Sequence, residues 1–447
     1  MVTVAVILFL LGYAAIVLEH PLRVDKTAIA LLTAVLCWTA LAVLPPPAEL
    51  QGAVANEFAT GHALAGPWQS YVVSSLQHHL EGAAEILFFL LGAMTIVELM
   101  DAHQAFGIIT DRITTRNGRR LMWVLGVATF FLSALLDNLT TTIVVASLVR
   151  KLVAEARLRW LYGGMIVIAA NAGGAFSPMG DVTTTMLWIG GQITAGPTLT
   201  HLFIPSLVCA LVPMLVLQRM LPKALGPLPA LAADPATHGR TCSRREQSIM
   251  LYVGLAALAF VPFFKVLTGL PPVFGMMLGL GIVWLVGEGL HRERPGEERR
   301  AFSAAAALSR ADTSSVLFFF GILMAIGALE ALHLLEHLAE ALVASVGRLD
   351  VIAYLIGVAS AVIDNVPLVA AAQGMFELNV YPTDSALWRY LAYAAGTGGS
   401  ALIIGSAAGV AVMGIENITF GWYVKHIGGL ALLGYTAGYL VLLALGG

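Results

Sequence analysis

Charged residues are scarce in this sequence of 447 amino acids. Asp, Glu, Lys and Arg make up 11% of the chain, against about 25% in an ordinary soluble domain. Hydrophobic residues make up 58%. A soluble fold of this size could not keep so much apolar surface from water, so the composition excludes a soluble protein.

The apolar residues fall in blocks of about 17–25 residues, the length that crosses a hydrocarbon core of about 30 Å. The blocks predicted to span the membrane are Val2–Leu18, Thr27–Leu44, Ile86–Met100, His201–Leu217, Met250–Lys265, Val273–Leu290, Thr313–Leu332 and Gly429–Leu445. The sequence therefore predicts an all-α polytopic protein embedded in the lipid bilayer.

Cysteines are few, and basic tracts are absent. Cys37, Cys209 and Cys242 lie in or beside apolar stretches and form neither a disulfide framework nor a zinc pattern. The net charge is −3, which argues against a nucleic-acid-binding protein because such proteins need a basic face. The apolar run at Val2 has no basic residue before it and no small-residue cleavage site, so we expect a membrane span there rather than a signal peptide.

The Lys and Arg residues cluster, and such clusters near membrane segments mark cytoplasmic loops. Four lie in 112–120, four in 150–159, five in 219–245 and five in 292–310. None lies between Thr27 and Asp111. Threading the spans through these clusters places the amino terminus outside and predicts a polar loop at roughly 45–80, between the second and third spans.

Two apolar stretches, Leu121–Val149 and Val351–Leu378, are shorter than the roughly 40 residues that two crossings require. Each must enter and leave by one face, the first from the cytoplasm and the second from outside. Near the middle of each lies the same polar group, Ser133 with Asp137-Asn138 and Ser360 with Asp364-Asn365, at a common offset of 227. The sequence therefore predicts two re-entrant helical hairpins, 121–149 and 351–378, with a carboxylate at each tip.

A second pattern recurs at an offset of 225, where Asn171-Ala-Gly-Gly174 with Gly180 corresponds to Gly396-Thr-Gly-Gly399 with Gly405. Clustered Gly, with Pro178 in the first copy, frees backbone carbonyls from the helix, which predicts broken helices over 160–194 and 390–412. Together the offsets indicate an inverted duplication, with a first repeat at 1–218, a cytoplasmic linker at 219–247 and a second repeat at 248–447. Many secondary transporters are built this way, with the substrate site where broken helices meet.

The residues at these breaks offer oxygen ligands. Carboxylate, amide, hydroxyl and freed carbonyl oxygens suit a small alkali cation, and no His, which a transition metal would prefer, lies at either break. Burial favours the protonated form of a carboxyl group, whereas a bound cation favours the ionised form. We therefore expect Asp137, Asp181 and Asp364 to hold protons without the cation and to release them when sodium enters.

Two interpretations stay open for the neighbouring polar residues. Asn171 either caps a half-helix or binds the ion. The threonines at 140–142 and 183–185 either serve the site or pack helices together, as threonines often do in membranes.

Three motifs, Ser133–Thr142, Asn171–Trp188 and Ser360–Pro367, resemble the NhaD-type sodium/proton antiporters. These belong to the ion transporter superfamily, which also holds dicarboxylate and arsenite carriers. The resemblance covers nearly the whole chain. It implies a secondary transporter, not an enzyme, that exchanges Na⁺ or Li⁺ for H⁺ across a bacterial inner membrane without a cofactor. It also implies two inverted repeats with re-entrant hairpins, a homodimer joined through scaffold helices, and elevator movement of a transport domain.

The resemblance also implies the residues of the ion site. It places the site on Ser133, Asp137, Asn138, Asn171, Asp181, Asp364 and Asn365, with support from Thr183, Thr184, Thr397 and Ser400. Ser360, the counterpart of Ser133, joins this set through the duplication. Sodium itself is expected at Asp137, Asn138, Asp181, Asp364 and Asn365.

Two other functions remain open. A sodium-coupled organic anion (dicarboxylate) or arsenite carrier would share the fold. Dicarboxylate carriers of the superfamily typically show Ser-Asn-Thr at each tip, whereas here the tips read Asp-Asn-Leu and Asp-Asn-Val, whose charge would repel a dianion. An intramembrane aspartyl protease would use Gly180-Asp181. Its Gly-x-Gly-Asp signature is broken by Pro178, and the chain contains no Tyr-Asp partner.

Overall fold

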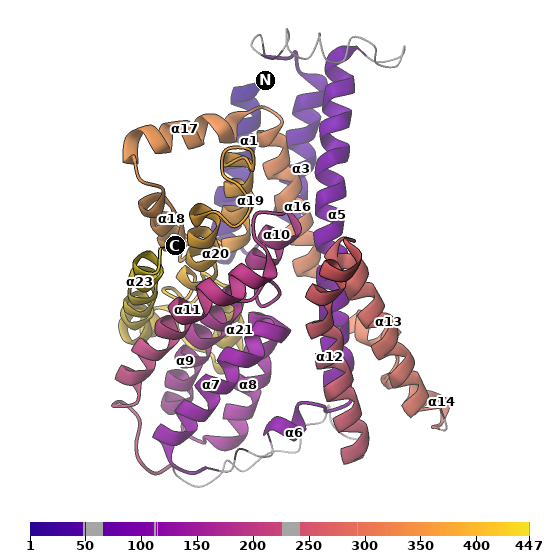
Figure 1. Ribbon diagram of the computed structural model, residues 1–447, viewed down its shortest axis with the longest axis vertical. Coiled ribbons are helices and arrows are strands. Elements are labelled where there is room, and N and C mark those ends of the chain that lie inside the picture. Colours follow the sequence, from indigo (N-terminus) through magenta and orange to yellow (C-terminus); the bar gives the residue numbers. More distant parts are fainter. Residues whose placement is uncertain are drawn as a thin grey trace. The chain divides into compact units, whose positions relative to one another are not determined.

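The computed structural model describes residues 1–47, 50, 66–110, 113, 115–225, 242–292 and 294–446. Every regular element in this part of the chain is helical and none is a strand, which confirms the all-α class (Figure 1). Eight helices found there are long and apolar enough to cross a membrane. The protein is therefore a polytopic membrane protein.

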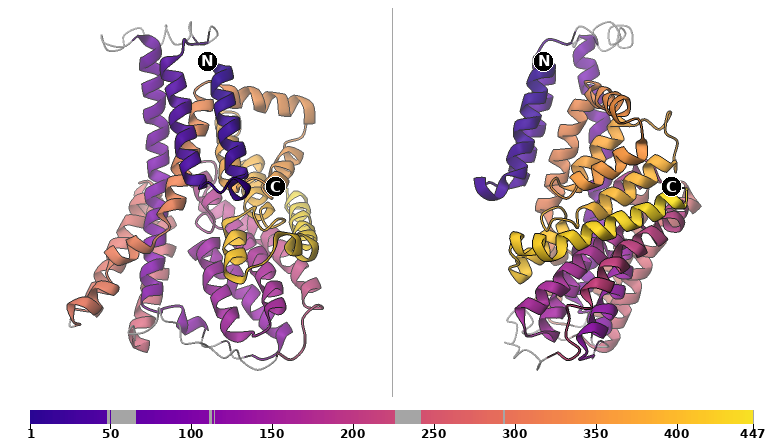
Figure 2. Two further views of the ribbon diagram at one scale, coloured as in Figure 1. Left: turned by 180° about the vertical axis from the view of Figure 1, so that it is seen from behind. Right: turned by 90° about the vertical axis from the view of Figure 1, so that its left-hand side faces the viewer.

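The chain forms two compact units, of which the smaller comprises Met1–Phe88, Asp312–Arg348 and Val366–Tyr381. Its helices are α1 (Val2–Val17), α2 (Glu19–Leu22), α3 (Lys26–Val43), the first part of α5 (Pro67–Ala102), α16 (Thr313–Glu330), α17 (Leu334–Val346) and all but the first residue of α19 (Asn365–Met375). α3 packs against both α1 and α16 (Figure 2). The indole Nε1 of the buried Trp38 donates to the carbonyl of Met324 at 2.8 Å, so its polar atom is satisfied inside the apolar core.

The larger unit comprises Phe89–Ala311, Leu349–Asn365 and Pro382–Gly447. Besides the end of α5, its elements are α6 (Gly107–Thr110), α7 (Gly118–Leu136), α8 (Asn138–Leu152), α9 (Ala156–Ala175), α10 (Val182–Ile189), α11 (Ala195–Leu217), α12 (Arg244–Thr268), α13 (Pro272–Leu290), α14 (Gly296–Ala301), α15 (Ala304–Arg310), α18 (Leu349–Ala359), α20 (Ala386–Gly398), α21 (Ala407–Glu416), α22 (Phe420–Tyr423), the π-helical turn η2 (Val424–Gly428) and α23 (Gly429–Ala444). α9 contacts α7, α8, α11, α20 and α21, and every residue from Leu161 to Ala175 is buried. This unit is therefore built around α9.

The prediction of a polar loop at roughly 45–80 is wrong from Pro67 onward. α5 begins at Pro67, and proline suits the first position of a helix. The helix persists through polar residues because tertiary contacts hold it: the buried Trp68 donates its Nε1 to the carbonyl of Leu41 at 2.9 Å. The rest of the predicted loop, at 48–49 and 51–65, lies outside the described residues, as does most of the predicted linker.

The helices are interrupted at the two sequence motifs. α7 and α8 meet at Asp137, α18 and α19 are separated by Ser360–Asp364, α9 and α10 by Phe176–Asp181, and α20 and α21 by Gly399–Ser406. The interruption after α9 is shorter than the sequence predicts, because Asn171–Ala175 continue the helix. The membrane placement of these pairs, their inverted topology and the proposed repeat boundaries stay predictions.

Close backbone packing recurs at the same offsets. A Cβ atom on Gly173 would overlap the carbonyl oxygen of Phe130, and one on Gly398 would overlap the carbonyl oxygen of Gly357. The first residues of the two pairs are 225 apart and the second residues are 227 apart, as in the sequence motifs. Glycine therefore lets α7 lie on α9, and α18 on α20, with their backbones in contact.

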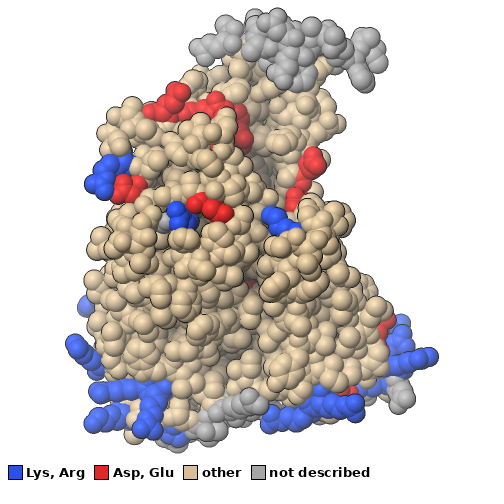
Figure 3. Space-filling view, viewed as in Figure 1, with Lys and Arg blue, Asp and Glu red and all other residues tan. Residues whose placement is uncertain are grey.

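Exposed basic side chains gather at one end of the larger unit (Figure 3). They include Arg120, Arg150, Arg157, Arg219, Arg244 and Arg245, at or near the ends of α7, α8, α9, α11 and α12. Positive charge at one end of a set of spans is typical of the cytoplasmic side. The orientation of the amino terminus stays a prediction.

The glycine contacts give a stability prediction. We expect Gly173→Ala and Gly398→Ala each to destabilise the protein by about 1–3 kcal/mol, because the added methyl group overlaps a backbone carbonyl that cannot turn aside. Gly414→Ala is the control, since Gly414 is helical and nothing lies within 4 Å of its added Cβ. Thermal unfolding of the detergent-solubilised variants measures the effect. If Gly173→Ala unfolds at the same temperature as Gly414→Ala, the close contact is wrong.

Candidate functional site

Asp137 is the single residue between α7 and α8. Its φ of 88° is unfavourable for a residue other than glycine, and such conformations concentrate at functional sites. Its carboxylate caps α8: Oδ1 accepts from the backbone N–H of Thr140 at 2.7 Å, and Oδ2 accepts from the Thr140 hydroxyl at 2.9 Å. The first tip therefore places a half-buried carboxylate at the N-terminus of a helix, where the helix dipole favours negative charge.

Asp181 lies at the break between α9 and α10, and is 2% exposed. It is the N-cap of α10: its Oδ1 accepts from the backbone N–H of Thr183 at 2.9 Å and from the Thr183 hydroxyl at 2.8 Å. Two tip asparagines converge on the same carboxylate. Nδ2 of Asn138 donates to Oδ2 at 2.6 Å, and Nδ2 of Asn365 donates to Oδ1 at 3.5 Å. A single buried carboxylate thus receives an amide from each of the two duplicated motifs.

Asn171 connects this carboxylate with the second break. It is fully buried inside α9, so it is not a helix cap. Its Oδ1 accepts from Nδ2 of Asn138 at 3.1 Å, and its own Nδ2 donates to the hydroxyl oxygens of Ser400 and Ser406, both at 2.9 Å. Asn171 is therefore part of a side-chain network that reaches from Asp181 to the start of α21.

Four of the predicted hydroxyls bond to backbone carbonyls, whereas that of Thr183 bonds to Asp181 and that of Ser400 accepts from Asn171. Ser133 donates to Ala170 at 2.6 Å and Ser360 donates to Ala395 at 3.3 Å, so the counterparts make the same contact. Two threonines donate to carbonyls near themselves: Thr184 to Asp181 at 3.0 Å and Thr397 to Tyr393 at 2.6 Å. These four hydroxyls hold the helices that carry the site.

The three aspartates have different surroundings, and the cation site expected on them stays a prediction. Among the residues that the structure describes, no three His, Cys, Asp or Glu side chains are arranged to hold a metal ion. Asp137 bonds to Thr140, and Asp364 is half-buried directly before α19. The network is therefore centred on Asp181.

Ser406 is the member of this network that the sequence reasoning missed. It is the N-cap of α21 with φ −151° and ψ 153°, and Asp181 caps α10 with φ −147° and ψ 147°. The offset between the two residues is 225, which is the offset of the broken-helix motif. Extending that motif by one residue beyond Gly180 and Gly405 would have found it.

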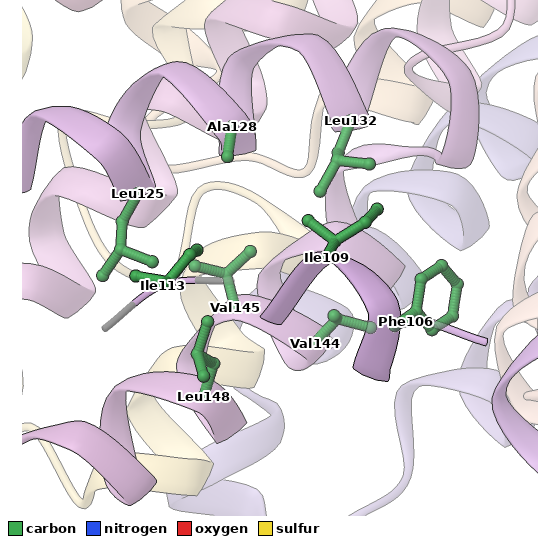
Figure 4. A pocket seen from close by; sticks show the side chains of 9 residues that line it. All are labelled: Phe106, Ile109, Ile113, Leu125, Ala128, Leu132, Val144, Val145 and Leu148. Carbon is green, nitrogen blue, oxygen red and sulfur yellow. The ribbon is translucent and has the colours of Figure 1, made fainter. Parts of the chain in front are cut away.

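A separate cavity lies between α6, α7 and α8 (Figure 4). Its lining consists of nine apolar side chains, among them Phe106, Leu125 and Leu148. Such a surface offers no ligand to a cation, so this cavity is not the ion site.

Known proteins are similar to this chain over almost its whole length. A family described as "Citrate transporter" matches residues 6–389. The chain is 47% identical over 443 residues to sodium/proton antiporter 1 of Arabidopsis thaliana, covering 98% of this chain and 71% of the relative. It is 44% identical over 445 residues to sodium/proton antiporter 2 of the same plant, covering 98% of each.

A bacterial relative is similar as well. The chain is 32% identical over 468 residues to the Na(+)/H(+) antiporter NhaD of Vibrio cholerae, which covers 99% of this chain and 91% of the relative. Since these relatives and the matching family are transporters, the aspartyl protease interpretation is excluded. The chain belongs to the NhaD-type sodium/proton antiporters of the ion transporter superfamily.

Proposed function

We propose that the protein exchanges Na⁺ or Li⁺ for H⁺ across the membrane, with Asp137, Asp181 and Asp364 as the groups that carry cation and proton in turn. The observation that carries the proposal is the convergence of Asn138 and Asn365 on the buried carboxylate of Asp181. The names of the antiporter relatives support the choice of ions.

The site offers the ligands that a small alkali cation prefers. Ionised Asp181 supplies charge, and Asn138, Asn171 and Asn365 each carry one amide oxygen. In the present arrangement Asn138 and Asn365 turn their N–H groups toward Asp181. These N–H groups stabilise the ionised form of Asp181, which is the form that attracts Na⁺.

Proton and cation exclude one another at such a carboxylate. A proton neutralises Asp181 and removes the charge that holds Na⁺, whereas Na⁺ favours the ionised form. A carboxylate that is neutral or ion-paired crosses the apolar phase at lower cost than a bare charge. If each side of the membrane has access to this site in turn, the site carries either H⁺ or Na⁺, and inward H⁺ movement drives Na⁺ outward.

The second candidate is an organic anion carrier, which the description of the matching family favours. The tips argue against it, because Asp137 and Asp364 stand there beside Asn138 and Asn365. A dianion bound among ionised aspartates would be repelled, whereas a cation would be attracted. The charge of the site therefore favours cation exchange.

Four further expectations stay predictions: a bacterial inner membrane, an amino terminus on the outside, a homodimer, and elevator movement. The inner-membrane prediction rests on the likeness to bacterial antiporters. Two plant antiporters are also similar to the chain and do not support a bacterial membrane.

The transport proposal predicts a dye response. In everted vesicles with an acidic interior and a pH-sensitive dye, Na⁺ or Li⁺ added without any organic anion should restore the fluorescence, because entering cation displaces protons. Vesicles without the protein are the control. A response that requires citrate or another dicarboxylate would instead show the anion carrier.

The two tip carboxylates give a mutational prediction. Asp137→Asn and Asp364→Asn should each abolish exchange, because an amide cannot carry the proton. Asn caps helices about as well as Asp, so Asp137→Asn keeps an acceptor for the Thr140 N–H and removes the charge.

Glu98→Gln is the matched control for these variants. Glu98 pairs with Arg310 at 3.1 Å, and both side chains are 31% exposed. A partly exposed pair contributes about 1 kcal/mol or less, so this variant should transport almost normally. Normal sodium-dependent exchange by either tip variant would contradict the role assigned to the tips.

A further inference from the structure

Ser406 stands where the first motif has Asp181. Both residues are N-caps with extended backbone, and both are at most 3% exposed. The duplicated break therefore carries a carboxylate in one copy and a neutral hydroxyl in the other. Because the backbones match, the difference lies in the side chain and in what it bonds.

The hydroxyl oxygen of Ser406 accepts two hydrogen bonds. One comes from the backbone N–H of Gly409 at 3.2 Å, which makes the helix cap, and the other comes from Nδ2 of Asn171 at 2.9 Å. A serine oxygen has two lone pairs, so these two donors use both. Ser406 thus joins the cap of α21 to an asparagine inside α9.

When Asp181 is ionised, its charge fixes the direction of this network. An ionised carboxylate can only accept hydrogen bonds, so Asn138 must turn its N–H group toward Asp181. Asn171 must then offer its oxygen to Asn138, as the 3.1 Å contact shows. Its N–H₂ group is left to face Ser400 and Ser406, whose oxygens must accept.

We propose that Ser406 is a positioning residue, which holds the amide of Asn171 in one orientation and, through it, orients the amide of Asn138 toward Asp181. The inference rests on the proposed function, because it assigns Ser406 to the sodium site of that exchange. An amide has nearly the same shape in both orientations, and only its hydrogen-bond partners decide between them. The hydroxyl oxygens of Ser400 and Ser406 are the two acceptors that select the orientation of Asn171. Without Ser406, one of these two acceptors is lost.

Ser406→Ala tests the proposal. The variant should raise the sodium concentration for half-maximal exchange by roughly three- to tenfold, the cost of losing one buried hydrogen bond, and should change the maximal rate by less than about twofold. Ser406→Thr keeps a hydroxyl that accepts both bonds and should restore the sodium dependence. If Ser406→Ala does not fold, Ser406→Cys, which keeps the size but is a weak acceptor, is measured in its place and the same shift is expected.

Ser303→Ala is the matched control. Ser303 also caps a helix, accepting from the N–H of Ala306 at 3.2 Å. Its substitution should lower the unfolding temperature without changing the sodium dependence. The proposal fails if Ser406→Ala leaves the half-maximal sodium concentration unchanged, if Ser303→Ala raises it equally, or if Ser406→Thr does not restore it.

The proposed function and the positioning role of Ser406 are tested separately by these measurements. If the unaltered protein gives no sodium response in the same vesicles, the proposed function is wrong. If it responds normally and Ser406→Ala responds at the same sodium concentrations, the proposed function stands and the positioning role of Ser406 is wrong.

Discussion

The buried carboxylate of Asp181 is the interaction on which the site depends. Its two oxygens accept from Thr183, Asn138 and Asn365, which places both duplicated motifs around one charge. A charge in an apolar interior is costly unless hydrogen bonds or an ion compensate it. These three residues compensate the charge of ionised Asp181 in part, and a bound Na⁺ or a proton would complete the compensation. Because either Na⁺ or H⁺ can supply that compensation, the binding of one ion at Asp181 is linked to the release of the other.

Backbone packing allows this convergence. Glycines at 173 and 398 let α7 lie on α9, and α18 on α20, closely enough that a methyl group would not fit. The hydroxyls of Ser133 and Ser360 then bond across the same helix pairs. Uncharged groups, namely backbone, glycine and serine hydroxyls, therefore position the site. Its few carboxylates remain available to bind Na⁺ or H⁺.

Much of this arrangement could be predicted from the sequence, because polar residues and glycine clusters stand out in an apolar chain. Asp137, Asp181 and Asp364 were found in this way, as were the helix breaks that carry them. The helix from Pro67 was missed because its polar residues predict a loop, and only its packing through Trp68 overrides that pattern. Ser406 was missed because serine is common in membrane helices, and its role follows only from its contact with Asn171.

The central claim is that sodium and protons compete for the same buried carboxylates. Proton release by the purified protein in weakly buffered solution tests it most directly. Added NaCl should acidify the solution in proportion to the protein, whereas the same concentration of choline chloride should not, and Asp181→Asn should reduce the release. Sodium binding without any release of protons would contradict the account.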